Sequence, residues 1–276
     1  MQKQTKSISL TQKLTESAVL LALSVVLSYL KLIDLPYGGS VTLCSMLPLI
    51  LVAYRHGLGF GLITGFAGSL IQLLMGLKNL SYATSALAAV AIILLDYVFA
   101  FTVTGLGGLF RGRMKQIPAL ISGTALACLL RYTFHVIAGC TVWAGLSIPD
   151  SQALLYSLAY NATYMLPELL ITLVGAAWLG GAVGFEGERL VRLKTESGNK
   201  VAPVFKMVGA AGGAAALITD VVLIASHLQN AETGDFDITG LAAVSWPTVL
   251  IVTLLGAIWL AVFWCIAKKR SNKVCE

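Results

Sequence analysis

Charged residues are scarce in this chain. Asp, Glu, Lys and Arg make up only 12% of its 276 residues, whereas 57% are hydrophobic and the mean hydropathy is +0.84. A soluble domain of this length needs far more polar surface, because its outside faces water. The composition therefore excludes a soluble globular protein and predicts a membrane protein.

The motifs of common enzymes and nucleotide-binding sites are also missing. The sequence contains no G-x-x-x-x-G-K-[ST] phosphate loop, no H-E-x-x-H and no G-x-S-x-G. Its five cysteines form no C-x-x-C pair, so we expect neither a metal site nor disulfides. The short basic segments lie where membrane topology requires them and do not indicate nucleic-acid binding. We expect no catalytic residue and no cofactor, and any ATP-driven step requires another chain.

Hydrophobic runs long enough to cross a bilayer recur along the whole chain. A membrane-spanning helix needs about 20 mostly apolar residues. The predicted spans are residues 12–33, 40–55, 57–76, 80–110, 117–145, 152–184, 205–228 and 246–268. These runs predict an all-α integral membrane protein with eight transmembrane helices.

One long polar interruption, residues 185–204, divides the predicted helices into two groups. Residues 1–184 are expected to form a six-helix substrate-binding domain, and residues 205–276 a two-helix hairpin with a basic tail. Of the 19 Lys and Arg residues, sixteen lie in inner segments if the N-terminus is inside, and only Lys31 and Lys78 lie outside. This bias predicts an even number of helices, a cytoplasmic linker at 185–204 and two cytoplasmic termini.

The one basic residue left over is Arg131, which lies within a predicted span. Ionisable residues at membrane depth are costly and indicate a functional site by default. The candidates of this kind are Asp96, Arg131, His135, Glu168 and Asp220. For Asp96 and Arg131 a structural alternative is open, because two opposite charges at similar depth could pair and fix the alignment of their helices.

Helical spacing relates the polar residues of the fifth span to one another. Arg131 and His135 are four residues apart, so they share a face and lie about 6 Å apart along the axis. Trp143 lies about 12 Å beyond His135 and is rotated by about 80°. We expect this helix to form one wall of a site that runs from mid-membrane to the outer surface.

The sixth span offers a second wall in the stretch YSLAYNATYMLPE, residues 156–168. Asn161, Tyr164 and Glu168 fall within about 60° of one another on the helix, and Pro167 predicts a kink. The fourth span adds Asp96 and Tyr97. Tyr29, Tyr82 and Trp246 are instead expected to be aromatic residues of the membrane interface.

Taken together, these side chains include carboxylates, an imidazole, an amide and several aromatic rings. Ring faces attract cations, and a few polar groups fix the orientation of a ligand. The composition predicts an outward-opening site for a flat, cationic, hydrogen-bonding small molecule.

Four ordered stretches resemble a known family. They are PYGGSVTLCSMLPLIL, LLDYVFAF followed by LGGLFR, RYTFHVIAGCTVW, and YSLAYN. Their order and spacing are similar to those of the thiamine-specific substrate-binding (S) components of energy-coupling factor (ECF) vitamin transporters. The resemblance covers about residues 10–184.

The resemblance implies a six-helix bundle in a bacterial plasma membrane that captures thiamine from outside with high affinity. It implies a transmembrane T component and two cytoplasmic ATPases as partners. It also implies a cavity lined by the fourth, fifth and sixth helices. Ala18 and Ala22 match the small-residue face that docks on the T component.

The same resemblance assigns roles to individual site residues. Asp96 stands where the family has an acidic ligand, usually glutamate, beside the tyrosine matched by Tyr97. His135 and Trp143 match the histidine and the stacking tryptophan. Two further ligand contacts are matched by Tyr156 and Asn161. Arg131 is then expected to be the counter-charge that holds Asp96 in place, and Tyr164 and Glu168 complete the predicted site.

Two positions depart from the family pattern. A tryptophan that covers the site from the first loop in some members is Gly39 here, with Tyr37 as the nearest aromatic residue, which predicts looser capping. Tyr156 would point about 140° away from Asn161 if the helix were already regular there, so its role requires a later helix start. An S component for another vitamin, a membrane enzyme with His135 as acid or base, and a structural membrane protein are the alternatives.

Overall fold

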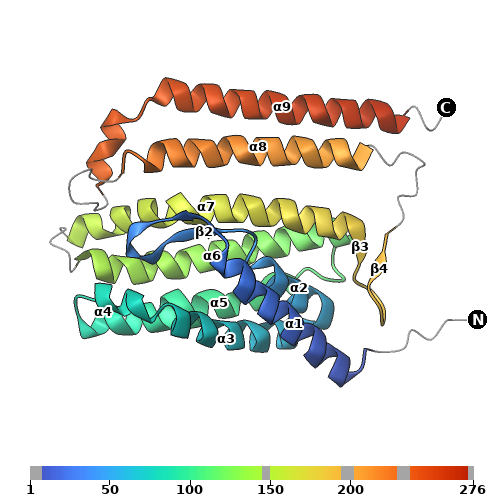
Figure 1. Cartoon of the computed structure of the whole chain (residues 1–276), viewed down its shortest axis with the longest axis horizontal. Helices are drawn as coiled ribbons and strands as arrows, with labels where there is room; N and C mark the ends of the chain where they lie inside the picture. The colour runs from blue at the N-terminus through green and yellow to red at the C-terminus, as the bar shows by residue number, and fades with distance from the viewer. Residues whose placement is uncertain (1–7, 145–149, 194–201, 229–236, 273–276) are drawn as a thin grey trace, which may run out of the picture. The chain divides into compact units, whose positions relative to one another are not determined.

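The computed structural model describes residues 8–144, 150–193, 202–228 and 237–272, and these form two compact units. The first unit comprises residues 1–191 and the second residues 192–276. Figure 1 shows the chain coloured from blue at the N-terminus to red at the C-terminus. We describe each unit by itself.

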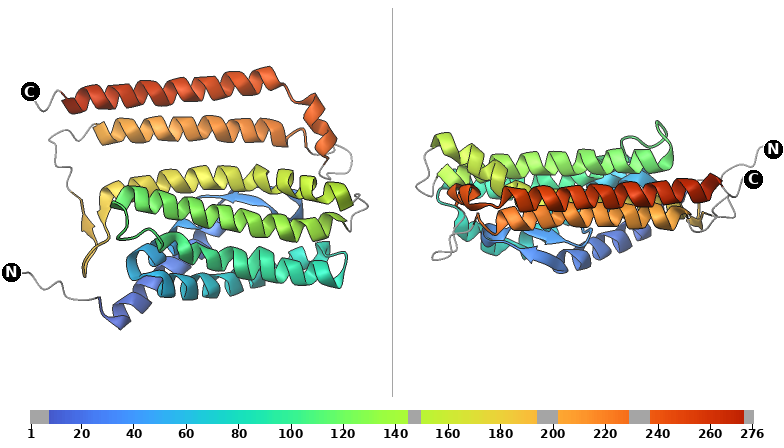
Figure 2. Two further views of the ribbon diagram at one scale, coloured as in Figure 1. Left: turned by 180° about the vertical axis from the view of Figure 1, so that it is seen from behind. Right: turned by 90° about the horizontal axis from the view of Figure 1, so that it is seen from above.

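The first unit is a helical bundle with two short β-hairpins. Its regular helices are α1 (Leu10–Tyr29), α2 (Leu47–His56), α3 (Leu58–Met75), α4 (Ala86–Ala91), α5 (Ala100–Thr102), α6 (Gln116–Ala144) and α7 (Asp150–Ala182). The hairpins are β1 (Lys31–Asp34) with β2 (Ser40–Thr42), and β3 (Val183–Gly184) with β4 (Val191–Arg192). The two longest helices, α6 and α7, pack side by side along their length (Figure 2).

The expectation of eight membrane-spanning helices is not met in the second predicted span. Among the described residues, seven helices are long and apolar enough to cross a membrane. Residues 40–55 do not form one helix, because β2 occupies their start and α2 has only ten residues. Ten helical residues rise about 15 Å, half the thickness of the hydrocarbon core. Every residue of α2 is buried, so this apolar run faces protein.

The fourth predicted span, 80–110, begins later and is less regular than expected. Residues 77–82 form a separate 3-10 turn, and α4 starts after Ser85, whose hydroxyl accepts a hydrogen bond from the backbone N–H of Ala88. A π-helix (Ile92–Phe99) follows, then α5 and a 3-10 segment (Val103–Gly108). Short π-helical stretches often occur at functional sites, and this one carries Asp96 and Tyr97.

The first hairpin, which we call the outer hairpin (residues 31–42), joins α1 to α2. Its turn contains Tyr37 and Gly38, both with positive φ angles of 62° and 91°. Strand β1 is largely exposed, whereas Val41 and Thr42 of β2 are buried. Strand β1 therefore lies on the surface of the unit, and strand β2 packs against the helical bundle.

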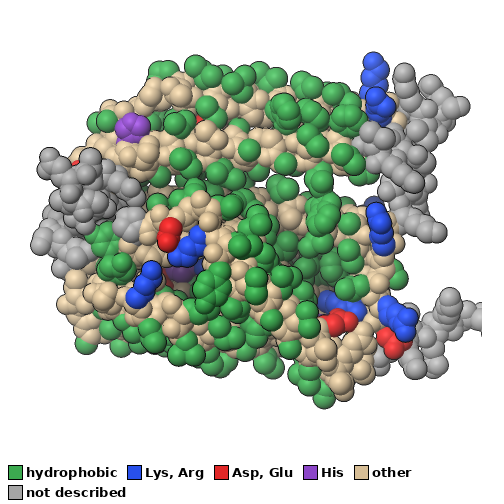
Figure 3. Space-filling model, viewed as in Figure 1, with side chains coloured by type: hydrophobic (Ala, Val, Ile, Leu, Met, Phe, Trp, Pro, Cys, Tyr) green, Lys and Arg blue, Asp and Glu red, His purple; other side chains and the backbone are tan. Residues whose placement is uncertain are grey.

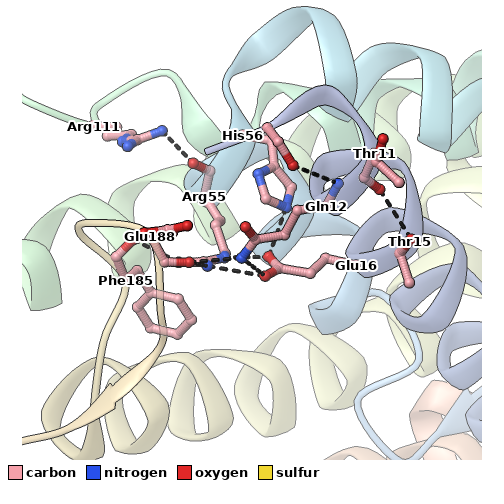
Figure 4. A network of polar contacts seen from close by, with 10 residues as sticks. Thr11, Gln12, Thr15, Glu16, Arg55, His56, Arg111, Phe185 and Glu188 are labelled. Atoms are coloured by element: carbon pink, nitrogen blue, oxygen red, sulfur yellow. Dashed lines mark hydrogen bonds and ion pairs between the residues drawn. The ribbon is translucent and has the colours of Figure 1, made fainter. Parts of the chain in front are cut away.

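At the opposite end of the unit, polar contacts hold α1 to the bundle (Figure 4). The Arg55 guanidinium, which is 2% exposed, forms a two-pronged ion pair with Glu16 of α1. It also donates to the backbone carbonyls of Phe185 and Glu188, at 3.1 Å each. Arg111 donates to the carbonyl of Arg55. We call Glu16, Arg55 and these carbonyls the inner cluster.

The surface of this unit is apolar between these two polar ends. In the space-filling view its visible face is mostly hydrophobic, and Lys, Arg, Asp and Glu side chains gather towards the ends (Figure 3). Such a surface suits lipid contact over the middle of the bundle.

The second unit is a helical hairpin. It consists of α8 (Ala202–Ala225), a 3-10 turn (Ile238–Ala243) and α9 (Trp246–Asn272). Gly213 and Gly256 lie where the two helices approach closely. Asp220 is buried between them and accepts a hydrogen bond from Thr253 at 2.5 Å.

Candidate binding cavity

A cavity of about 360 Å³ opens in the first unit between the outer hairpin and the helices. Pockets of about 300–1,000 Å³ are typical of small-molecule sites. Its lining includes seven of the residues singled out from the sequence, namely Asp96, Tyr97, Arg131, His135, Asn161, Tyr164 and Glu168. The hairpin side is lined by Tyr37, Gly38, Gly39, Ser40 and Thr42.

Asp96, His135 and Arg131 form one hydrogen-bonded chain in the cavity wall. The Asp96 Oδ1 lies 2.8 Å from His135 Nδ1, and Arg131 Nε donates to His135 Nε2 at 3.1 Å. Because Nε2 accepts a hydrogen bond from Arg131, the imidazole proton is on Nδ1, which donates a hydrogen bond to Asp96. The structure thus differs from the expected direct pairing of Arg131 with Asp96, since the imidazole lies between them.

Arg131 has a second contact that fixes its position. Its guanidinium lies over the ring of Phe101, 4.2 Å from the ring centroid. A guanidinium over an aromatic face is stabilised electrostatically. The Asp96 side chain remains 27% exposed, so part of the carboxylate faces the cavity.

Asn161 and Tyr164 of α7 both contact His135. The Asn161 side-chain amide donates to the carbonyls of Ser157 and His135, and its oxygen accepts from the Tyr164 hydroxyl. The Tyr164 ring meets the imidazole edge to face at 5.9 Å. Both side chains are buried, so α7 holds this part of the wall rigidly against α6.

Tyr97 connects the fourth span to the turn after α3. Its hydroxyl donates to the carbonyl of Gly76 at 3.1 Å and accepts from Asn79 Nδ2 at 2.8 Å. These contacts fix the 3-10 turn at residues 77–82, which lines the cavity next to the outer hairpin.

Glu168 contacts the outer hairpin. Its Oε2 accepts from the backbone N–H of Thr42 at 2.6 Å, and its Oε1 accepts from the hydroxyls of Thr42 and Ser45 at 2.7 and 3.4 Å. The side chain is 3% exposed. Both carboxylate oxygens are therefore already bonded within the protein.

Tyrosines close the outer side of the cavity. The ring of Tyr37 meets Tyr82 edge to face at 5.2 Å and Tyr160 at 6.3 Å. Gly39 lies against α7, with its N–H donating to the Tyr160 hydroxyl at 2.9 Å. A Cβ on Gly39 would meet this hydroxyl at 2.7 Å and the ring of Tyr164 at 2.7 Å. The space that a larger side chain needs is therefore filled by α7.

Among the described residues, Tyr156 is a predicted site residue that does not line the cavity. Helix α7 begins at Asp150, so the helix is already regular at Tyr156, and the condition for its pointing toward Asn161 is not met. Trp143 belongs to the last turn of α6, but its side chain lies outside the described residues.

Other cavity residues were missed by sequence reasoning. Tyr160 stands four residues before Tyr164, and this spacing was a usable signal for a shared face. Tyr29 and Tyr82, expected at the membrane interface, line the cavity as well. No sequence pattern marked Asn79 or Thr42, because their partners lie in distant segments.

The predicted docking face lies on α1. Ala18 and Ala22 are both exposed in the first unit.

Within the described ranges, no three His, Cys, Asp or Glu side chains come together in a way that could hold a metal ion.

Comparison with known proteins places this site in context. The family described as thiamine transporter protein (Thia_YuaJ) matches residues 14–181. The thiamine transporter ThiT of Bacillus subtilis (strain 168) is 32% identical over 171 residues, which is 58% of this chain and 85% of that protein. A solved structure of ThiT from Listeria monocytogenes is 22% identical, with a TM-score of 0.50, over 61% of this chain and 92% of that one.

Proposed function

This chain belongs to the thiamine transporter family of ECF S components, and on that premise we propose that it holds thiamine in the cavity between the outer hairpin and helices α6 and α7. It is a multi-pass membrane protein of a family of substrate-binding transporter subunits, and not an enzyme. The observation that carries the site assignment is the hydrogen-bonded chain Asp96–His135–Arg131 in the cavity wall, with the buried imidazole at its centre.

Thiamine is a cation with a flat aminopyrimidine ring, and the cavity offers a partner for each of these features. The exposed part of the Asp96 carboxylate provides the negative charge and accepts hydrogen bonds. His135, locked by its two neighbours, presents a fixed ring edge, and Tyr97 and Tyr164 supply aromatic surface. Trp143 and Tyr156 are proposed contacts on the family resemblance alone. Arg131 holds the imidazole and balances the charge of Asp96.

The proposed orientation places the cavity towards the cell exterior and both termini in the cytoplasm. Arg55 and Arg111, which belong to predicted inner segments, contact one another at the end of the unit with the inner cluster. Lys31 and Lys78, from predicted outer segments, line the cavity. This separation supports the orientation that the positive-inside bias predicts.

We propose that transport needs a T component and two ATPase subunits, with Ala18 and Ala22 of the exposed α1 face as the docking site. Small residues let two helices approach closely in lipid. Replacing Ala22 with Leu is expected to abolish thiamine uptake in cells that supply these partners, while purified protein keeps its thiamine affinity. Equal loss of binding and uptake would contradict a docking role.

Titration of the purified protein in detergent tests the binding function. Thiamine is added while tryptophan fluorescence is followed, and calorimetry measures the stoichiometry. We expect saturable quenching with one thiamine per chain. Absence of both heat and quenching with thiamine, together with binding of another vitamin, would assign the site to a different ligand.

A further inference from the structure

Glu168 was expected to contact the ligand, but its surroundings indicate a different task. Each of its oxygens accepts a hydrogen bond from the outer hairpin, the shortest being 2.6 Å from the Thr42 N–H. With 3% of its surface exposed, the carboxylate has little area left for a bound molecule. We propose that Glu168 is a positioning residue that holds the outer hairpin over the cavity, an inference that rests on the proposed thiamine site.

The attachment is matched to the geometry of strand and helix. Tyr160 and Glu168 are eight residues apart on α7, which separates them by about 12 Å along the axis. Their partners Gly39 and Thr42 are three residues apart in extended chain, which spans about 10 Å. Strand β2 is therefore fixed to α7 at Thr42 and through Gly39 just before its start, two points with nearly equal spacing, and Val41 between them is fully buried.

The hairpin depends on these attachments because it is a small element. A two-stranded hairpin alone is marginally stable in water. Strand β1 pairs with β2 and is otherwise mostly exposed. The hairpin turn carries Tyr37 to Tyr82, and this contact closes the outer side of the cavity. Loosening Thr42 from Glu168 therefore loosens the wall that Tyr37 completes.

This role is distinguishable from a direct electrostatic contact with the thiamine cation. Glu168→Gln removes the carboxylate charge but keeps an oxygen to accept from the Thr42 N–H, and its amide can donate to the hydroxyls of Thr42 and Ser45. Glu168→Met removes charge and acceptor alike at similar length. A hydrogen-bonding role separates the two variants, whereas a charge role makes them equal.

The experiment has two measurements on the full chain in detergent. Hydrogen exchange of residues 31–46 is followed in ligand-free protein, and thiamine dissociation is followed by stopped-flow tryptophan fluorescence. For Glu168→Met we expect the Thr42 amide to lose protection and thiamine to dissociate about tenfold faster, as expected for a lost buried hydrogen bond. Glu168→Gln should stay within about twofold of the wild type in both measurements.

Controls keep the outcomes apart. Thr172→Val removes a hydroxyl that donates to the Glu168 backbone carbonyl, away from the hairpin, and should leave exchange unchanged. Thr42→Val removes the hydroxyl with its contacts to Glu168 and Ser45 but keeps the backbone N–H bond to Glu168, and it serves if Glu168→Met does not fold. It should raise hairpin exchange by less than Glu168→Met. Equal loss of affinity in the Gln and Met variants, with wild-type exchange in both, would overturn the proposal. The hydrogen-exchange measurement uses ligand-free protein, so it tests the role of Glu168 even if the protein does not bind thiamine.

Discussion

Gly39→Ala is the smallest change that tests how the outer hairpin meets the bundle. The added Cβ would lie 2.7 Å from the Tyr160 hydroxyl, and 2.7 and 2.9 Å from two ring carbons of Tyr164. A Cβ atom does not lie this close to other heavy atoms in folded proteins, so either the hairpin backbone or the tyrosine side chains must move. Tyr164 is held by its bond to Asn161, and the Tyr160 hydroxyl accepts from Gly39 itself. The hairpin is therefore the part that yields.

The cost follows from overpacking. Forcing one carbon into a filled site costs about 1 to 3 kcal/mol. Because the strain falls on the conformation with the hairpin closed over the cavity, the binding-competent fraction drops by the same free energy. This corresponds to about 5- to 150-fold weaker thiamine binding. Gly39→Trp, which introduces the residue found in some family members, should weaken binding further, because α7 occupies the space.

Calorimetric titration with thiamine measures the effect, and Gly59→Ala is the matched control. Gly59 lies in the first turn of α3 with nothing within 4 Å of an added Cβ. The Gly59→Ala variant should therefore bind thiamine as tightly as the wild type. Thermal unfolding of both variants separates loss of binding from loss of folding. Wild-type affinity in Gly39→Ala would refute the close approach of hairpin and α7 as a condition of binding.

Three further predictions concern the site, the inner cluster and the second unit. His135→Ala should weaken thiamine binding at least about tenfold in calorimetry, because Asp96 and Arg131 lose the group between them; unchanged affinity would remove His135 from the site. Arg55→Met should destabilise the ligand-free protein by about 1 to 3 kcal/mol in denaturant unfolding, because Glu16 loses its guanidinium hydrogen bonds and the carbonyls of Phe185 and Glu188 lose a donor. An unchanged unfolding midpoint would show that the inner cluster adds nothing to stability. A chain ending at residue 193 should bind thiamine as tightly as the full chain, because every described residue that lines the cavity lies between Ser28 and Glu168. Weaker binding would give the second unit a part in the site.

The membrane-spanning pattern was readable wherever a helix faces lipid. Six of the eight predicted spans correspond to helices within a few residues of their expected limits, and a seventh, 80–110, to an irregular helix that starts later. The prediction of a membrane-spanning helix at residues 40–55 was wrong, because hydropathy does not distinguish burial in protein from burial in lipid. Leu47–His56 is as apolar as a span, yet it is short and surrounded by the bundle.

The candidate site shows the same division at the level of single residues. Spacing within one helix correctly placed Arg131 beside His135, and Asn161 beside Tyr164, because both pairs are local. It did not reveal that His135 stands between Arg131 and Asp96, since that depends on the packing of α6 against a π-helix 39 residues earlier. The contact of Glu168 with Thr42 joins residues 126 positions apart.

The sequence by itself determined the class of the protein and, through four ordered stretches, its family. These depend on composition and on helical periodicity, which act over one or two turns. Only the tertiary structure decided which partner each buried polar group has, that α2 is an internal half-length helix, and that Glu168 is bonded to the outer hairpin. A buried donor or acceptor must find a partner, but which one it finds depends on which segments the fold brings together.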